Sequence, residues 1–156
     1  MNAPHLTENE HRRIACIAES YARLTGRPLV ADSDADPVEA LWRAPMAIVA
    51  HGTEADPIFF FGNRTALVLF EMDFDEFRRL PSRFSAEPLL REERARLLER
   101  VTKNGIIADY AGVRISASGR RFRIANASVW NLTDRRGNAV GQAAAFSEWI
   151  EMTATT

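Results

Sequence analysis

Residues 105–150, GIIADYAGVRISASGRRFRIANASVWNLTDRRGNAVGQAAAFSEWI, contain three runs in which side chains alternate between two faces. A period of two residues is typical of β-strands, because successive side chains of a strand point to opposite sides. Turn residues at Ser118-Gly119 and at 134–138 separate the runs, and the last run covers 139–150. The sequence therefore predicts a three-stranded antiparallel meander in the last third of the chain.

The residues before this meander predict an early hairpin followed by helices. Short apolar runs at 46–50 and 58–61 flank a loop with Gly, Asp and Pro, as in a hairpin. Asn63 stands where it can cap a short helix, and residues 89–103 carry apolar side chains at helical spacing. Two strands, several helices and three further strands make an α+β fold.

The N-terminal segment predicts a helix with one apolar face. Thr7 and Glu10 have the spacing of a capping box, and the residues after them repeat at helical spacing. We expect the apolar stripe to pack on the sheet or on a second copy of the chain, which would form a homodimer through residues 8–25. The expected organisation is a helical extension at 1–45, a domain at 46–150 and a tail at 151–156. The stripe consists of Ile14, Ile17, Tyr21 and Leu24.

Several motifs resemble a known family. The order of elements is that of PAS domains, and FFFGNRTALVLFEMDFDEF resembles their strand, Asn-capped helix and following helix. The stretches FFFGNRTALVLF, LPSRFSAEP, GIIADYAGVRIS, GRRF and ASVWNLTD, in this order, resemble the MEKHLA family, which occurs as a stand-alone bacterial protein and at the C-terminus of plant homeodomain leucine-zipper factors. The resemblance implies a PAS-like five-stranded antiparallel sheet with helices on one face. It also implies a sensory or regulatory role, and it supplies no catalytic residues.

The amino-acid composition argues against several classes of protein. Apolar residues make up 46% of the chain and charged residues 26%, with a net charge of −1, as in ordinary globular proteins. Nucleic-acid binders of this size carry a basic excess, so we do not expect a nucleic-acid partner. Cys16 is the only cysteine, the first ten residues lack the pattern of a secretory leader, and no apolar run reaches the length of a membrane span. We therefore expect a cytoplasmic protein without a membrane anchor.

A ligand pocket is predicted on one face of the last strand. Small side chains alternate there at Gly141, Ala143, Ala145 and Ser147, which leaves room for a ligand unless bulky neighbours or another helix fill it. Asn126 is expected to be buried, because it shares the alternation of Phe122, Ile124 and Trp130. The candidate ligand-binding residues are Asn126, Asp109, Tyr110, Trp130, Ser128, Phe61 and Asn63.

One of the neighbours Asp109 and Tyr110 must face the core, since a strand alternates. A buried Asp109 would need a partner such as Arg83 or Arg121. A second hypothesis follows from this pair: a small enzyme with an α+β cavity, using Asp109 as base and Tyr110 as hydrogen-bond donor. A third hypothesis is an interaction scaffold that binds no ligand.

Metal and cofactor signatures are weak. His51, Glu54 and Asp56 share one polar loop without cysteine support, so a plain turn is expected there and no metal site. Residues 89–103 contain no histidine that could ligate haem. LPSRFSAEP lacks the cysteine that a covalent flavin photosensor uses, although noncovalent flavin stays open.

These observations favour a non-enzymatic function. We expect a sensory or regulatory domain that binds a small molecule or a protein partner. It would signal through a change of conformation or of dimerisation.

Overall fold

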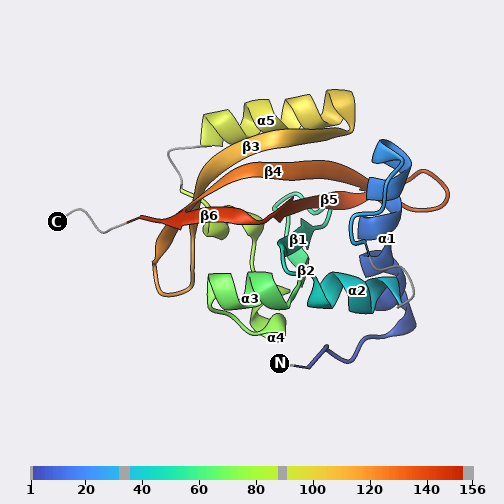
Figure 1. Cartoon of the computed structure of the whole chain (residues 1–156). Helices are drawn as coiled ribbons and strands as arrows, with labels where there is room; N and C mark the ends of the chain where they lie inside the picture. The colour runs from blue at the N-terminus through green and yellow to red at the C-terminus, as the bar shows by residue number, and fades with distance from the viewer. Residues whose placement is uncertain (1, 32–35, 88–90, 153–156) are drawn as a thin grey trace.

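The computed structural model describes residues 2–31, 36–87 and 91–152 (Figure 1). The helices and strands follow in the order expected for the α+β fold. The elements are α1 (Glu8–Thr25), α2 (Pro37–Arg43), β1 (Ala47–His51), β2 (Phe59–Gly62), α3 (Arg64–Phe70), α4 (Phe74–Phe77), the 3-10 helix η1 (Ser82–Ser85), α5 (Arg91–Asn104), β3 (Ile106–Ile115), β4 (Arg121–Thr133), β5 (Ala139–Phe146) and β6 (Glu148–Glu151).

One antiparallel sheet forms the centre of the molecule. Its strand order is β2-β1-β5-β4-β3, so the predicted hairpin and meander are confirmed and join through β1 and β5. The expected last strand at 139–150 is interrupted at Ser147 and becomes β5 and β6. Both pieces pair with β4 in one register, with Ala145 opposite Ser128 and Glu148 opposite Ala125. The sheet therefore has six strands where five were predicted.

Helix α1 covers one face of the sheet. The capping box of Thr7 and Glu10 begins the helix, as predicted. Ile17 is fully buried, and its carbonyl oxygen accepts a hydrogen bond from Trp130 Nε1 on β4 at 3.1 Å. The ring of Tyr21 packs edge-on against Trp130, with 5.1 Å between the centroids. The sheet of the same chain therefore covers Ile17 and Tyr21, whereas Leu24 at the end of the stripe stays exposed.

Helix α5 packs on the opposite face, as Figure 1 shows for its position along β3. Leu97 and Val101 of α5 contact Ile107 of β3 and Val129 of β4, and these four buried residues form a cluster separate from the main core. Val129 precedes Trp130, so alternation directs the two side chains to opposite faces. The main core, by contrast, unites α1, α2, α3 and α4 with the rest of the sheet.

A β-bulge at Asn126 changes the alternation of β4. Asn126 has a positive φ of 53°, and the register between β3 and β4 shifts on both sides of Tyr110. An extra residue in a strand resets which face the following side chains take. Ile124 consequently lies on the same face as Val129, although the two are an odd number of positions apart and regular alternation would put them on opposite faces. The expectation that residues 122–132 keep one alternation was wrong for this reason.

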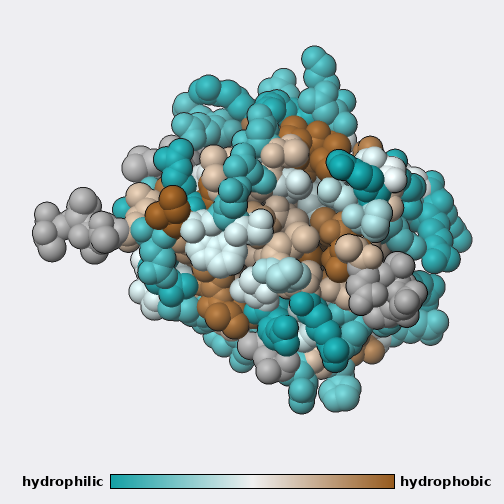
Figure 2. Space-filling model, in the orientation of Figure 1, coloured by the Kyte–Doolittle hydropathy of each residue, from teal (hydrophilic) through white to brown (hydrophobic). Residues whose placement is uncertain are grey.

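One face of the molecule shows scattered rather than continuous apolar areas. On the face shown in Figure 2, hydrophobic patches are separated by pale and hydrophilic residues. Ile150 on β6 is the most exposed of the large hydrophobic residues that the structure describes, at 75%. In the described part of the chain, no helix is long and apolar enough to cross a membrane.

Candidate functional site

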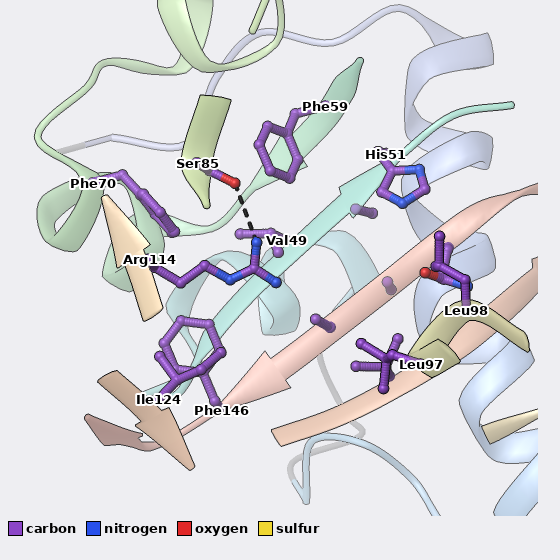
Figure 3. Close-up of a pocket in the computed structure, with 15 residues that line it drawn as sticks. Val49, His51, Phe59, Phe70, Ser85, Leu97, Leu98, Arg114, Ile124 and Phe146 are labelled. Atoms are coloured by element: carbon purple, nitrogen blue, oxygen red, sulfur yellow. Dashed lines mark hydrogen bonds between the residues drawn. The ribbon is translucent and has the colours of Figure 1, made fainter. Parts of the chain in front are cut away.

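A cavity lies on the α5 face of the sheet, where α5, α3, η1 and the strands converge (Figure 3). Its volume is about 40 Å³, room for roughly three water molecules. The lining residues are Val49, Ala50, His51, Phe59, Phe70, Ser85, Leu97, Leu98, Arg114, Ile124, Val129, Gln142, Ala143, Ala144 and Phe146.

Ala144 is a small side chain in the middle of the strands that line the cavity. Ala144 of β5 lies between Val49 of β1 and Val129 of β4, and both are its direct cross-strand partners. Directly opposite residues of neighbouring strands share a face, so the alanine lies between two larger aliphatic side chains. Leu97 of α5 closes the cavity from above the sheet. A methyl group between two valines thus leaves an apolar hollow.

Arg114 brings a positive charge into this apolar cavity. Figure 3 shows its guanidinium group inside the ring of labelled residues, with a dashed line to Ser85. Arg114 Nη1 donates to Ser85 Oγ and Nη2 donates to Tyr110 Oη, each at 3.4 Å. Both distances are at the long end for a hydrogen bond, so both bonds are weak. In the described part of the chain, Arg114 forms no ion pair with a carboxylate.

A second polar group connects the cavity with α5. Gln142 of β5 donates from Nε2 to Asn131 Oδ1 of β4 at 3.2 Å. Asn131 Nδ2 donates in turn to the carbonyl oxygen of Val101 in α5, also at 3.2 Å. His51 completes the polar wall, and its Nδ1 is 2.9 Å from the carbonyl oxygen of Gly52. The chain from Gln142 to Val101 links a cavity-lining side chain directly to the helix backbone.

None of the seven candidate ligand-binding residues lines this cavity. Asn126 is exposed, and its Nδ2 donates to Glu148 Oε2 at 2.7 Å, so the expectation of burial was wrong. The bulge at Asn126 itself is the reason, because it takes the side chain out of the regular alternation. Trp130 is buried on the α1 face, and Ser128 is half-buried opposite Ala145.

Asp109 lies on the surface beside α5. Its carboxylate accepts a hydrogen bond from Arg100 Nη2 at 3.0 Å, and its side chain is 65% exposed. The expected partners Arg83 and Arg121 form ion pairs with other carboxylates. The acid–base hypothesis requires a carboxylate that is enclosed in a cavity apart from any arginine, so this exposed and paired position does not favour it. Tyr110 is half-buried, with its hydroxyl beside Arg114.

Asn63 and Phe61 belong to the core. Asn63 is fully buried, and Oδ1 accepts hydrogen bonds from the backbone amides of Ile48 and Ala66 at 3.0 Å. Its Nδ2 donates to the carbonyl oxygens of Leu41 and Met46, at 3.0 and 2.8 Å. The predicted helix cap is confirmed, and the same amide also joins α2 to β1. Phe61 contacts Phe74 in an edge-on arrangement.

The small-residue face of β5 meets the α1 side of the sheet. Ala143 is the direct partner of Trp130, and Gly141 lies opposite Leu132. Of this face, only Ala143 is among the cavity-lining residues, whereas Ala144 and Gln142 of the other face both line the cavity. Trp130 and helix α1 lie on this side, so a bulky neighbour and a helix fill the space over the small residues. This is the alternative to a ligand pocket there.

Cys16 is buried on α1 in surroundings that disfavour a reactive thiol. Burial raises the pKa of the Cys16 thiol, and the nearby Glu19 carboxylate acts in the same direction. The thiol therefore stays protonated at neutral pH, the form that is a poor nucleophile. Among the described side chains, no group of three His, Cys, Asp or Glu residues has metal-binding geometry.

Comparison with known proteins identifies the family. The model of the MEKHLA domain matches residues 11–151, nearly the whole chain. The chain belongs to the MEKHLA family. No curated protein matches this MEKHLA domain significantly.

Solved structures similar to the MEKHLA domain include PAS and light-oxygen-voltage domains. A PAS domain from Colwellia psychrerythraea has a TM-score of 0.60 at 15% identity, covering 74% of this chain and 92% of its own. A light-oxygen-voltage domain studied with a flavin analogue has a TM-score of 0.56 at 19% identity, covering 77% and 87%. A PAS domain of a two-component sensor histidine kinase has a TM-score of 0.55 at 15% identity, covering 73% and 91%. The MEKHLA domain therefore has a PAS-like fold.

Proposed function

We propose that this MEKHLA domain binds a small molecule in the cavity under α5 and signals by moving α5. The observation that carries the proposal is the position of α5 over the cavity, held by a small cluster of its own. Leu97 belongs both to this cluster and to the cavity wall. A molecule that enters the cavity therefore changes the packing of the helix directly.

Helix α5 packs on the sheet outside the main core. Its cluster contains four buried residues, whereas α1 contributes Ile14 and Ile17 to the main core. Elements with few buried apolar contacts open locally at a lower free-energy cost than core elements. We expect α5 to be displaced before any element of the main core.

The hydrogen-bonded chain from Gln142 through Asn131 to Val101 supplies a second link. A ligand that bonds to Gln142 competes for the amide that now donates to Asn131. Asn131 in turn holds the Val101 carbonyl, and its own backbone amide donates to Gly105 at the end of α5. A polar ligand in the cavity would thereby alter the hydrogen bonds that hold the C-terminal turn of α5.

The cavity volume favours a ligand smaller than flavin. Pockets that enclose drug-sized ligands measure about 300–1,000 Å³. The light-oxygen-voltage neighbour was studied with a flavin analogue, and a three-ring flavin far exceeds a cavity of about 40 Å³. A compact molecule of a few non-hydrogen atoms fits without rearrangement, and longer molecules would displace α5.

Dimerisation through residues 8–25 is not part of this proposal. It was expected because the stripe of α1 needed cover, and Ile14 and Ile17 obtain that cover from the sheet. We therefore assign the signal to a change of conformation.

Filling the cavity is expected to remove the ligand. Ala144→Phe places an aromatic ring in the hollow under Leu97, so the protein purified from its own host should lose any bound small molecule. Native mass spectrometry of the wild type should show an added small-molecule mass, and this mass should be absent from Ala144→Phe.

Ala139→Phe is the matched control, because Ala139 is exposed at the start of the same strand. This control should retain the added mass, and circular dichroism should show that both variants are folded. A wild-type protein without added mass, or a folded Ala144→Phe that keeps it, would refute the proposal.

A further inference from the structure

We infer that the cavity selects a short-chain carboxylate, whose carboxyl group pairs with Arg114 and whose apolar tail lies under α5. The inference rests on the proposed function and names its class of ligand. It is carried by the Arg114 guanidinium group at the wall of an apolar cavity, which pairs with no carboxylate among residues 2–31, 36–87 and 91–152.

Several other arginines of the described chain form ion pairs with carboxylates, and Arg114 does not. Arg83 forms an ion pair with Asp56, Arg100 with Asp109 and Arg120 with Glu71, although all of these side chains are substantially exposed. Arg114 is less exposed than Arg83 or Arg100, yet its contacts in the described part of the chain are neutral: the hydroxyls of Ser85 and Tyr110, and the Tyr110 ring.

Arg114 is half-buried, and a charge that is partly removed from water is stabilised by a partner of opposite charge. None of the lining residues is acidic, so the protein wall does not supply that partner to Arg114. The same charge disfavours a cationic ligand. An anion that enters the cavity would supply the missing counter-charge.

The donors around Arg114 match one carboxyl group. A guanidinium group offers two parallel N–H donors, which pair with both oxygens of a carboxylate. The Ser85 hydroxyl lies 3.4 Å from Arg114 Nη1. It already donates its hydrogen to the carbonyl oxygen of Ser82 at 2.7 Å, so it has no second hydrogen to donate to a ligand. A phosphate group carries three acceptor oxygens and more charge than this set satisfies. The geometry therefore favours a monocarboxylate.

The other residues that line the cavity limit the size and polarity of the ligand's apolar tail. Val49, Val129 and Phe146 are apolar and buried, and Leu97 and Leu98 close the α5 side. A volume of about 40 Å³ accommodates a molecule the size of roughly three waters. Acetate and propionate match this size, and each further methylene would press on Leu97. The displacement of α5 should therefore increase with the length of the ligand's apolar tail.

The test compares acids with their uncharged isosteres. Acetate, propionate, butyrate and hexanoate, each paired with its amide, are titrated into the full chain and followed by NMR chemical shifts of the α5 methyl groups. We expect the wild type to bind butyrate at least tenfold more tightly than butyramide, because only the acid forms the charge-assisted pair with Arg114.

Variants of Arg114 test whether this side chain causes the preference for butyrate over butyramide. Arg114→Gln should bind butyrate and butyramide equally, and Arg114→Lys should keep part of the preference as a single point charge. Arg123→Gln removes the same charge from an exposed position of β4 and should behave as the wild type. Retained butyramide binding by Arg114→Gln would show that its cavity is intact.

The outcomes separate this inference from the proposed function. Equal binding of butyrate and butyramide by the wild type would overturn the carboxylate while leaving a small-molecule cavity. A preference for butyrate that survives in Arg114→Gln would overturn the role of Arg114. Absence of binding by every acid and amide would overturn the ligand class, and the Ala144→Phe comparison would then decide the proposed function independently.

Discussion

Replacement of Asn63 by Asp is expected to lower the free energy of unfolding by about 3–5 kcal/mol. The amide nitrogen of Asn63 now donates to the carbonyl oxygens of Leu41 and Met46. An aspartate presents an oxygen to both carbonyls and buries a charge at a position with no solvent exposure. Urea unfolding followed by tryptophan fluorescence measures the loss.

Asn9→Asp is the matched control for this change. Asn9 is exposed in the first turn of α1, where a negative charge is well tolerated. Its unfolding midpoint should stay close to that of the wild type. An Asn63→Asp protein as stable as this control would show that the buried amide network is not formed.

Ile17→Glu is expected to destabilise the fold by about 3–5 kcal/mol, because it buries an unpaired carboxylate against Trp130. The effect arises within one chain, since Ile17 packs on its own sheet. Thermal unfolding by circular dichroism measures the loss of stability, and sedimentation measures the mass of the protein that remains folded.

Leu24→Glu distinguishes this explanation from a dimer interface. Leu24 lies on the same predicted stripe but is 41% exposed, so its replacement should change stability by less than about 0.5 kcal/mol. An interface through α1 would require both variants to dissociate a dimer while remaining folded. That result would contradict the packing of α1 on the sheet.

Local signals explain why the fold was predictable from the sequence. The alternation of 139–146, the capping box of Thr7 and Glu10, and the cap at Asn63 depend on residues a few positions apart. Each signal agrees with the same order of elements. The break of the last strand at Ser147 was missed, because alternation continues across it in the sequence.

The candidate site was less predictable because it depends on distant residues. Arg114 is 29 residues from Ser85, and no spacing rule joins them. One extra residue at Asn126 changed which face of β4 lines the cavity, and sequence periodicity cannot locate such a bulge. The sequence did single out β5, yet Ala144 rather than the alternating residues around it lies at the centre of the hollow.

Hydrogen–deuterium exchange of α5 tests most directly whether a ligand in the cavity is communicated to this helix. The experiment compares the full chain with and without saturating butyrate, and it follows residues 97–104 beside residues 8–25 of α1. The proposed coupling predicts that butyrate changes the exchange of α5 and leaves α1 unaltered, and that Arg114→Gln abolishes the change. Butyrate that binds without altering the exchange of α5 would contradict it.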